Sequence, residues 1–312
     1  MDSDTLDRIR SNDHHALSRV ISEIEFNGQI SDAFFHEVHS HANEALRIGI
    51  TGPPGSGKST LVDQLIQQII SDGKSVGVVA VDPTSPFTGG ALLGDRVRMN
   101  HYIWDNNVFI RSMGSHGDLG GLARKAQDVG DLLAASGKDV VIFETVGVGQ
   151  GEHDVAKAVD LTMVVLVPES GDEIQLMKAG LIEIADVFVV NKSDRDGAGR
   201  LAQSLKSILH AFNKKGKLEP PVFSTSADRN EGIGELYNGL NEFIQVMEDE
   251  GLMAQKQLDR HRKRVFNLVQ DRLLREFWTQ AKLNKLEESI HNLNSTNASP
   301  HEVAHSLLSA ND

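Results

Sequence analysis

The chain has 312 residues, of which 39% are hydrophobic, so it is long enough to bury the core of one large α/β domain with helical extensions. Its 31 basic and 44 acidic residues give a net charge of −13, which disfavours a broad nucleic-acid footprint or an anionic membrane surface. The absence of cysteine excludes disulfides and thiolate metal ligands. Residues 1–10 are charged, and no segment approaches the roughly 18 apolar residues of a membrane span, so we expect a cytoplasmic protein.

The segment 1–45 is expected to form an N-terminal helical extension. Apolar residues recur at helical spacing over residues 11–26, which predicts a helix that is capped by Asn12 or Asp13 and stopped by Gly28. Three histidines lie close together after it: His36, His39 and His41. Their spacing matches no standard set of metal ligands, so the sequence favours a solvated linker over a metal site.

A glycine-rich motif between an apolar run and an amphipathic run organises the rest of the chain. Residues 52–59 read Gly-Pro-Pro-Gly-Ser-Gly-Lys-Ser, which fits the phosphate-loop pattern at every fixed position. Its glycines let backbone N–H groups turn toward a triphosphate, Lys58 supplies a charge for the β- and γ-phosphates, and Ser59 supplies a hydroxyl for Mg²⁺. The nucleotide-binding residues expected here are Gly55, Ser56, Gly57, Lys58, Ser59 and Thr60.

An acidic residue ends the next predicted strand. Residues 76–81 form a continuous apolar run that suits a strand buried on both faces, and Asp82 stands at its carboxyl end. In a parallel sheet that end borders the ligand crevice, so Asp82 is placed for Mg²⁺ or its waters. Residues 83–96 are rich in glycine and proline, which predicts a mobile loop over the phosphates with Asp95 and Arg96 placed to sense the γ-phosphate.

A second strand-end acid follows a helix predicted over residues 122–135. The apolar strand predicted over residues 139–143 ends in Glu144, and Gly147 follows three residues later. A carboxylate and a glycine so spaced sense the γ-phosphate through metal-bound water and a backbone N–H. Val148 stands where many GTPases carry the glutamine that orients the attacking water, so we expect slow intrinsic hydrolysis.

A base-recognition set follows the predicted strand at residues 187–190, after further strands expected at 108–112 and 161–167. Asn191, Lys192 and Asp194 form an Asn-Lys-x-Asp set typical of guanine recognition. In this set the aspartate accepts two N–H bonds from the base, the asparagine reads or braces the carbonyl side, and the lysine packs over the ring. The sequence therefore predicts binding of GTP/GDP.

A short strand at residues 222–223 precedes the pair Ser226 and Ala227, which is placed to present a backbone N–H to the guanine carbonyl. The helix after this pair closes a GTPase domain predicted over residues 46–248. Because the predicted strands and helices alternate along the chain, the sequence indicates an α/β fold with a mostly parallel sheet.

A C-terminal helical arm is predicted over residues 249–291. Apolar residues recur there at helical spacing with no proline or glycine between positions 252 and 290, which predicts one long helix. Such a helix packs its apolar stripe on its own domain or on a partner. The basic cluster at residues 260–264 favours a solvated face over a nucleic-acid site, and residues 292–312 form a polar tail expected to be flexible.

These motifs together resemble one family. The phosphate loop with its preceding residues 49–51, the segment 81–90, residues 144–150 and the set at 191–194 are similar to those of the MeaB/ArgK type of GTPase. That family chaperones adenosylcobalamin-dependent acyl-CoA mutases, and the resemblance runs from about residue 17 to the C-terminal helix. It implies a P-loop NTPase fold of the SIMIBI type.

The resemblance also implies cofactors, partners and site residues. GTP/GDP and Mg²⁺ would bind, the partner would be an adenosylcobalamin-dependent acyl-CoA mutase, and the chain would form a homodimer. Gln175 and Lys178 match a switch segment that relays the partner's signal. The residues expected to surround the metal are Ser59, Asp82, Asp95 and Glu144, and those expected to serve catalysis are Lys58, Asp82, Asp95, Glu144 and Lys178.

Two other classes of P-loop protein remain as alternatives. A GTPase that inserts nickel or another metal shares the fold but normally brings cysteine and histidine ligands, whereas this chain has no cysteine. A small-molecule kinase would need a substrate pocket and would not need Asn191 and Asp194. The sequence favours a Mg²⁺-dependent GTPase that gates cofactor loading and protects or reactivates its partner mutase.

Overall fold

The computed structural model divides into two compact units, Met1–Arg260 and His261–Asp312. It describes residues 3–26, 30–42, 45–82, 100–102, 104–114, 119–145, 156, 158–169, 180–212, 218–291 and 299–309. Within these residues no helix is both long and apolar enough to span a membrane.

A seven-stranded sheet forms the centre of the first unit, with the order β3-β2-β4-β1-β5-β6-β7 and parallel pairing throughout. Its strands are β1 (Leu46–Thr51), β2 (Val76–Asp82), β3 (Val108–Gly114), β4 (Val140–Thr145), β5 (Leu161–Leu166), β6 (Val187–Val190) and β7 (Val222–Ser224). Every residue of β4, β5 and β6 is buried, as expected for apolar strands covered on both faces. The α/β fold with a parallel sheet is confirmed.

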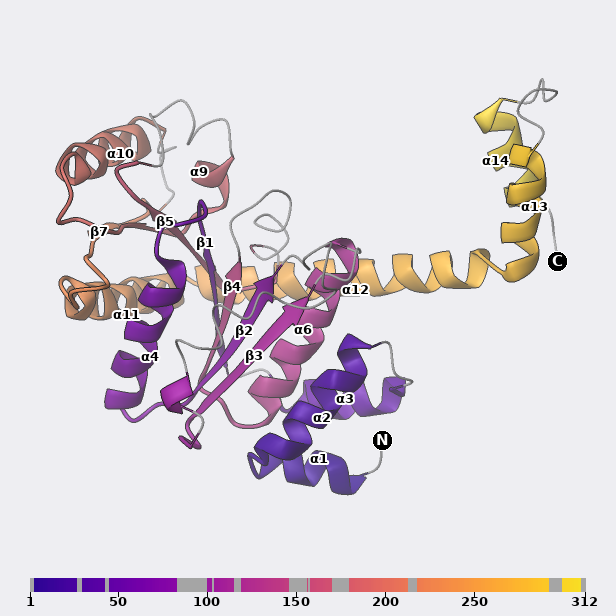
Figure 1. Cartoon of the computed structure of the whole chain (residues 1–312), viewed down its shortest axis with the longest axis horizontal. Coiled ribbons are helices and arrows are strands. Elements are labelled where there is room, and N and C mark those ends of the chain that lie inside the picture. The colour runs from indigo at the N-terminus through magenta and orange to yellow at the C-terminus, as the bar shows by residue number, and fades with distance from the viewer. Residues whose placement is uncertain are drawn as a thin grey trace. The chain divides into compact units, whose positions relative to one another are not determined.

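Helices cover both faces of this sheet (Figure 1). The helices α4 (Lys58–Ser71) and α11 (Ile233–Asp249) bury their apolar sides on one face, where Ile142 of β4 contributes to the core. On the other face α6 (Leu119–Ala135) packs against the neighbouring residue Phe143. The helices α9 (Leu181–Ile184) and α10 (Ala198–Phe212) cover β5 and β6. A short 3₁₀ turn, η1 (Asn100–Tyr102), precedes β3.

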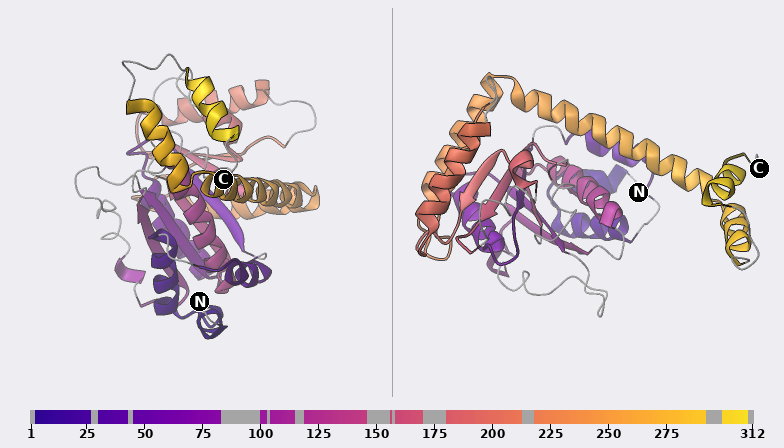
Figure 2. Two further views of the ribbon diagram at one scale, coloured as in Figure 1. Left: turned by 90° about the vertical axis from the view of Figure 1, so that its right-hand side faces the viewer. Right: turned by 90° about the horizontal axis from the view of Figure 1, so that it is seen from above.

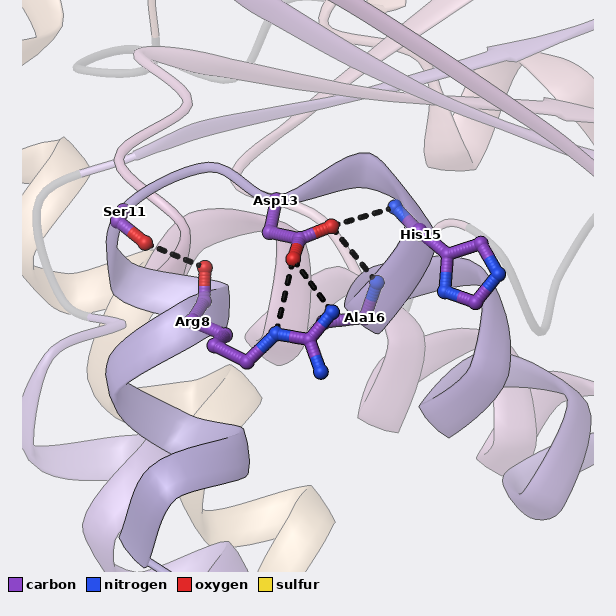
Figure 3. Close-up of polar contacts among 5 residues, drawn as sticks. All are labelled: Arg8, Ser11, Asp13, His15 and Ala16. Atoms are coloured by element: carbon purple, nitrogen blue, oxygen red, sulfur yellow. Dashed lines mark hydrogen bonds and ion pairs between the residues drawn. The ribbon is translucent and has the colours of Figure 1, made fainter.

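The N-terminal extension comprises three helices, α1 (Ser3–Arg10), α2 (His14–Glu25) and α3 (Asp32–Ser40). It lies beside α6 (Figure 2) and shares that helix's apolar core. The cap predicted for α2 falls on Asp13, whose Oδ1 accepts the N–H groups of His15 and Ala16 at 2.9 and 3.0 Å (Figure 3). Asp13 Oδ2 also accepts two bonds from the Arg8 guanidinium, at 2.9 and 2.7 Å, which joins α1 to α2.

The linker predicted around the three histidines is wrong, because His36 and His39 lie in α3 and His41 follows directly as its C-cap. Ser31 caps this helix, and Phe34 and Val38, four residues apart, bury its inner face. The three histidines are exposed: His36, His39 and His41. In the part of the chain that the structure describes, no group of three histidine or acidic side chains is arranged to hold a metal ion.

The C-terminal segment contains the helices α12 (Leu252–Phe277), α13 (Gln280–His291) and α14 (Pro300–Ser309). The prediction of one continuous helix is wrong at Trp278 and Thr279. The Thr279 hydroxyl accepts the N–H of Lys282 at 3.3 Å, so it starts a new helix without any proline or glycine. The tail predicted to be flexible contains α14, which packs against α13 and buries Leu307.

Candidate functional site

The predicted nucleotide-binding residues gather where the parallel strands end. The strands β1, β2, β4, β6 and β7 all end at the carboxyl edge of the sheet, since every pairing is parallel. The chain changes direction at β1, which lies between β4 and β5, and ligands of α/β sheets bind outside such a switch point. The phosphate loop, residues 52–59, follows β1 at this place.

The phosphate loop depends on glycine at two tightly packed positions. Gly52 has φ +141°, and a Cβ there would lie 2.1 Å from the carbonyl oxygen of Val165 in β5. Gly57 has φ +86°, and a Cβ there would lie 2.4 Å from Asn191 Nδ2. Because no side chain fits at either place, the phosphate loop can closely approach β5 and the loop after β6, residues 191–194, which we call the base loop.

Lys58 is the first residue of α4 and is buried, with 6% of its surface exposed. Its Nζ donates to the carbonyl oxygens of Gly52 and Pro53, at 2.9 and 3.1 Å. These bonds hold the ammonium group within the phosphate loop, at the positive end of the α4 dipole. The position suits the binding of anionic phosphate.

Ser59 and Glu144 bring two oxygens together beside the phosphate loop. Ser59 Oγ donates to Glu144 Oε1 at 2.5 Å, and Glu144 is buried on β4, opposite Ile50 of β1. Asp82 ends the adjacent strand, one residue beyond the pair formed by Val81 and Thr145. These groups offer only hydroxyl and carboxylate oxygens, which is the donor chemistry that Mg²⁺ prefers, so the residues present fit the predicted metal.

Asn191 braces three loops of the site and is itself buried, with 2% of its surface exposed. Its Nδ2 donates to the carbonyl oxygen of Ser56 at 2.9 Å. Its Oδ1 accepts the Thr225 hydroxyl and the Ala227 N–H, each at 3.1 Å. The predicted role of the pair Ser226 and Ala227, to present a backbone N–H to the guanine carbonyl, stays a prediction; in this structure the Ser226 N–H donates to the Glu231 carbonyl at 2.9 Å.

Lys192 and Asp194 lie nearer the surface of the base loop. Lys192, at φ 55°, donates from Nζ to the carbonyl oxygen of Gly55 at 2.8 Å, so its stem spans from the base loop to the phosphate loop. Asp194 Oδ1 accepts the Ser226 hydroxyl at 2.5 Å, and this bond is the main reason that the pKa of Asp194 lies below its usual value. Asp194 is therefore an ionised acceptor at neutral pH.

Sequence reasoning missed several groups that complete the site. Arg229 forms an ion pair with Asp194, with 2.9 Å between Nη2 and Oδ2. The hydroxyls of Thr145 and Thr51 bond at 2.9 Å where β4 and β1 end. Threonine at a strand end carries no distinctive sequence signal. The polar residues around Arg229 predict a loop and no specific contact.

Three predicted site residues lie outside the residues that the structure describes: Asp95, Gly147 and Lys178. The predicted relay residue Gln175, the loop over 83–96 and the position of Val148 lie outside them as well. The arrangement above therefore rests on the phosphate loop, Asp82, Glu144 and the base-recognition residues.

Comparisons with known proteins show the family of this chain. The family model described as methylmalonyl Co-A mutase-associated GTPase MeaB matches residues 15–282. A protein of Pyrococcus abyssi is 39% identical over 311 residues, covering 99% of this chain and 96% of its own. GTPase ArgK of Escherichia coli is 35% identical over 261 residues, covering 81% of this chain and 79% of its own.

A solved structure gives the same fold. The crystal structure titled LAO/AO transport system kinase aligns with a TM-score of 0.71 at 24% identity, over 98% of this chain and 96% of the other. At this identity the likeness concerns the fold alone, whereas the family rests on the sequence matches. The chain belongs to the MeaB family of P-loop GTPases, so it is a GTP hydrolase, as its motifs predicted.

Proposed function

We propose that the carboxyl edge of the sheet binds GTP through the phosphate loop and selects guanine through Asp194. Lys58 would contact the β- and γ-phosphates, and the ionised Asp194 would accept N–H bonds from the base edge. Adenine offers no matching pair of donors at that edge, so GTP should bind much more tightly than ATP. Asn191 would act as a brace that fixes the distance between the two loops.

Mg²⁺ would be held by Ser59 and Glu144. Asp82 and Asp95 would contact the ion directly or through bound water. Bound there, the ion would neutralise charge on the phosphates. Glu144 already holds the Ser59 hydroxyl at 2.5 Å, so it orients the oxygen that the metal needs. Glu144→Gln should weaken Mg²⁺-dependent binding of GTP more than metal-free binding of GDP.

We further propose that the client is an adenosylcobalamin-dependent acyl-CoA mutase, whose cofactor loading this GTPase gates and which it protects or reactivates. The observation that carries this proposal is the match of residues 15–282 to a family described as methylmalonyl Co-A mutase-associated. Val148 lacks the amide that would orient water, so hydrolysis should be slow until a partner supplies the missing positioning. By linkage, the bound nucleotide should then alter affinity for the partner.

Single-turnover GTP hydrolysis with and without the purified mutase tests this partnership. We expect a faster rate with the mutase, and a smaller stimulation for Lys178→Ala, which changes the proposed relay. Adenosylcobalamin loading of the mutase should also depend on whether GTP or GDP is present. If the candidate mutases of the same organism change neither the rate nor their own loading, the client belongs to another class.

A homodimer through the arm at residues 249–291 is the remaining part of the proposal. Within α12 only Met253 is buried, whereas seven apolar side chains are 46–68% exposed: Leu258, Val265, Phe266, Leu268, Val269, Leu273 and Leu274. Such a stripe is typical of a helix that packs against a second chain. Leu268→Glu with Leu273→Glu should yield a monomer in sedimentation, and a monomeric parent protein would reject the proposal.

A further inference from the structure

The carboxylate of Asp194 is held at both of its oxygens by groups of different kinds. The neutral Ser226 hydroxyl bonds to Oδ1 at 2.5 Å, and the charged Arg229 guanidinium lies 2.9 Å from Oδ2. The Asp194 side chain is 16% exposed and that of Arg229 is 56% exposed, so the ion pair is accessible to solvent on the side of Arg229. Two contacts at opposite oxygens restrict rotation of the carboxylate plane.

The turn that carries Arg229 is closed by its own backbone. The N–H of Arg229 donates to the Ser226 carbonyl at 2.9 Å, and Ser226 and Glu231 exchange two backbone bonds of 2.9 and 3.2 Å. At Gly232, with φ +72°, a Cβ would lie 2.3 Å from the Ser224 carbonyl oxygen, so the chain crosses itself closely there. These backbone contacts fix the turn that carries the Arg229 guanidinium beside Asp194.

Neighbouring charged groups have other contacts. Arg195, next to Asp194 in the chain, forms an ion pair with Glu169, and Lys192 bonds to the Gly55 carbonyl. Asp228 lies 3.4 Å from the Ser226 hydroxyl and adds negative charge on that side. Among the described residues, Arg229 is the cation in an ion pair with Asp194, whereas Arg195 lowers the pKa of Asp194 through its charge and forms its ion pair with Glu169.

We propose that Arg229 is a positioning residue for guanine selection: by pairing with Asp194 Oδ2, it fixes the carboxylate for the two N–H donors of the base. This inference rests on the guanine-reading role proposed above for Asp194. Each carboxylate oxygen has two lone pairs, so the contacts of Ser226 and Arg229 leave one acceptor site per oxygen for the base. Arg229 therefore acts through Asp194 and need not touch the nucleotide.

Guanine and hypoxanthine nucleotides separate this role from a general loss of binding. Inosine diphosphate lacks the 2-amino group and therefore engages Asp194 with one donor instead of two. Dissociation constants for GDP and inosine diphosphate can be measured by calorimetry on the full chain carrying Arg229→Ala, Arg229→Lys or Arg195→Ala. Arg195→Ala is the matched control, since it removes a neighbouring arginine that pairs with Glu169.

For Arg229→Ala we expect GDP to bind about fivefold more weakly, the upper range for a partly exposed charge pair, and inosine diphosphate to change less. Arg229→Lys should recover part of the loss, and Arg195→Ala should leave the GDP preference unchanged. As the pH is lowered, Arg229→Ala should also lose GDP binding at a higher pH than the parent protein does, because Arg229 helps keep Asp194 ionised.

Two results would overturn the proposal. One is an Arg229→Ala protein with unchanged constants, and the other is an equal loss for both nucleotides, which would indicate a general effect on the turn. Asp194→Asn provides the separate test of the underlying site, because it should move preference toward xanthosine diphosphate. If Asp194→Asn makes no such shift, the role of Asp194 itself fails, whatever Arg229 does.

Discussion

The two edges of the central sheet both carry charged side chains, but they use them differently. At the carboxyl edge Lys58 begins α4 and Asp194 lies in the loop after β6, and their contacts come from loop carbonyls, a hydroxyl and one exposed arginine. At the amino edge Asp160 is fully buried in front of β5. It accepts the backbone N–H of Arg47 at 3.0 Å and lies 3.3 Å from Arg260 Nη1.

The pKa values of the two aspartates shift in opposite directions. The hydrogen bond from Ser226 lowers the pKa of Asp194. Burial raises the pKa of Asp160, although Arg260 and Arg47 oppose this shift. A carboxylate that binds the edge of a nucleotide base has to be both charged and accessible. Asp194 meets both requirements, and Asp160 does not.

The amino edge instead joins elements of the first unit to one another. Arg47 at the start of β1 pairs with Asp131 of α6 at 2.5 Å, and Lys256 of α12 pairs with Asp186, in front of β6, also at 2.5 Å. The Arg47 side chain is 5% exposed, and an ion pair of a buried charge is costly to break but does not by itself indicate a ligand site, whereas the Lys256 side chain is 36% exposed. The comparison predicts that substitutions at one edge affect binding and those at the other affect stability.

Lys58→Ala should produce the largest change in binding. Loss of the phosphate-contacting ammonium should weaken GTP and GDP by about 100-fold or more, while the free energy of unfolding changes by about 1 kcal/mol or less, because the lost bonds are to loop carbonyls. Lys256→Ala at the amino edge is the matched control and should bind nucleotide normally. Titration with a fluorescent GDP analogue and urea unfolding measure both quantities; near-normal binding by Lys58→Ala would contradict the assignment.

Asp160→Ala should produce the largest loss of stability. The substitution leaves Arg260 and the Arg47 N–H without their buried acceptor, so the free energy of unfolding should fall by about 3 kcal/mol. GDP affinity measured under native conditions should stay unchanged. A double-mutant cycle with Arg260→Ala should show coupling between the two sites, and purely additive effects would argue against the pair.

Much of the first unit could be predicted because its signals are local. Residues 187–190 were expected as a strand and form β6, since a short apolar run covered on both faces has few other solutions. Asp13 caps α2 because a carboxylate at that position satisfies exposed N–H groups. The helix α10 was missed although Leu201, Leu205, Ile208 and Leu209 follow helical spacing.

The site was predictable in its motifs but not in its connections. The phosphate loop and Asp194 carry residue types that their proposed chemistry requires. Asn191 bonds to Ser56, 135 positions earlier in the chain, and this contact exists only after β1 and β6 take their places in the sheet. Similarly, Arg229 reaches Asp194 through the closure of its turn, which no spacing rule predicts.

Two glycines with nearly the same backbone angle provide a finer comparison of the edges. Gly57 in the phosphate loop has φ +86° and Gly137 before β4 has φ +84°, so alanine should cost about 1–2 kcal/mol of stability at either position. A Cβ at 137 has no neighbour within 4 Å, whereas a Cβ at 57 would lie 2.4 Å from Asn191 Nδ2. Gly57→Ala should therefore also weaken GDP binding, and Gly137→Ala should not. Equal GDP affinities of the two variants would show that the brace is dispensable.

The smallest expected effect concerns Lys138, which lies buried before β4 at the amino edge. Its Nζ donates to the Asn106 carbonyl at 2.8 Å, and burial lowers its pKa to about 8 from an ordinary value of 10.5, despite the nearby Asp105 and Asp139. Between these two values the unfolded chain binds more protons than the folded chain, so the free energy of unfolding should rise as the pH rises. The gain expected from this residue between pH 8 and pH 9 is about 1 kcal/mol. Urea unfolding of the parent protein and of Lys138→Met at both pH values isolates it, because methionine keeps the stem without the charge. The difference in free energy of unfolding between the two proteins should be smaller at pH 9 than at pH 8, because the parent then no longer buries a charge. An equal difference at both pH values would mean that Lys138 titrates near its ordinary value.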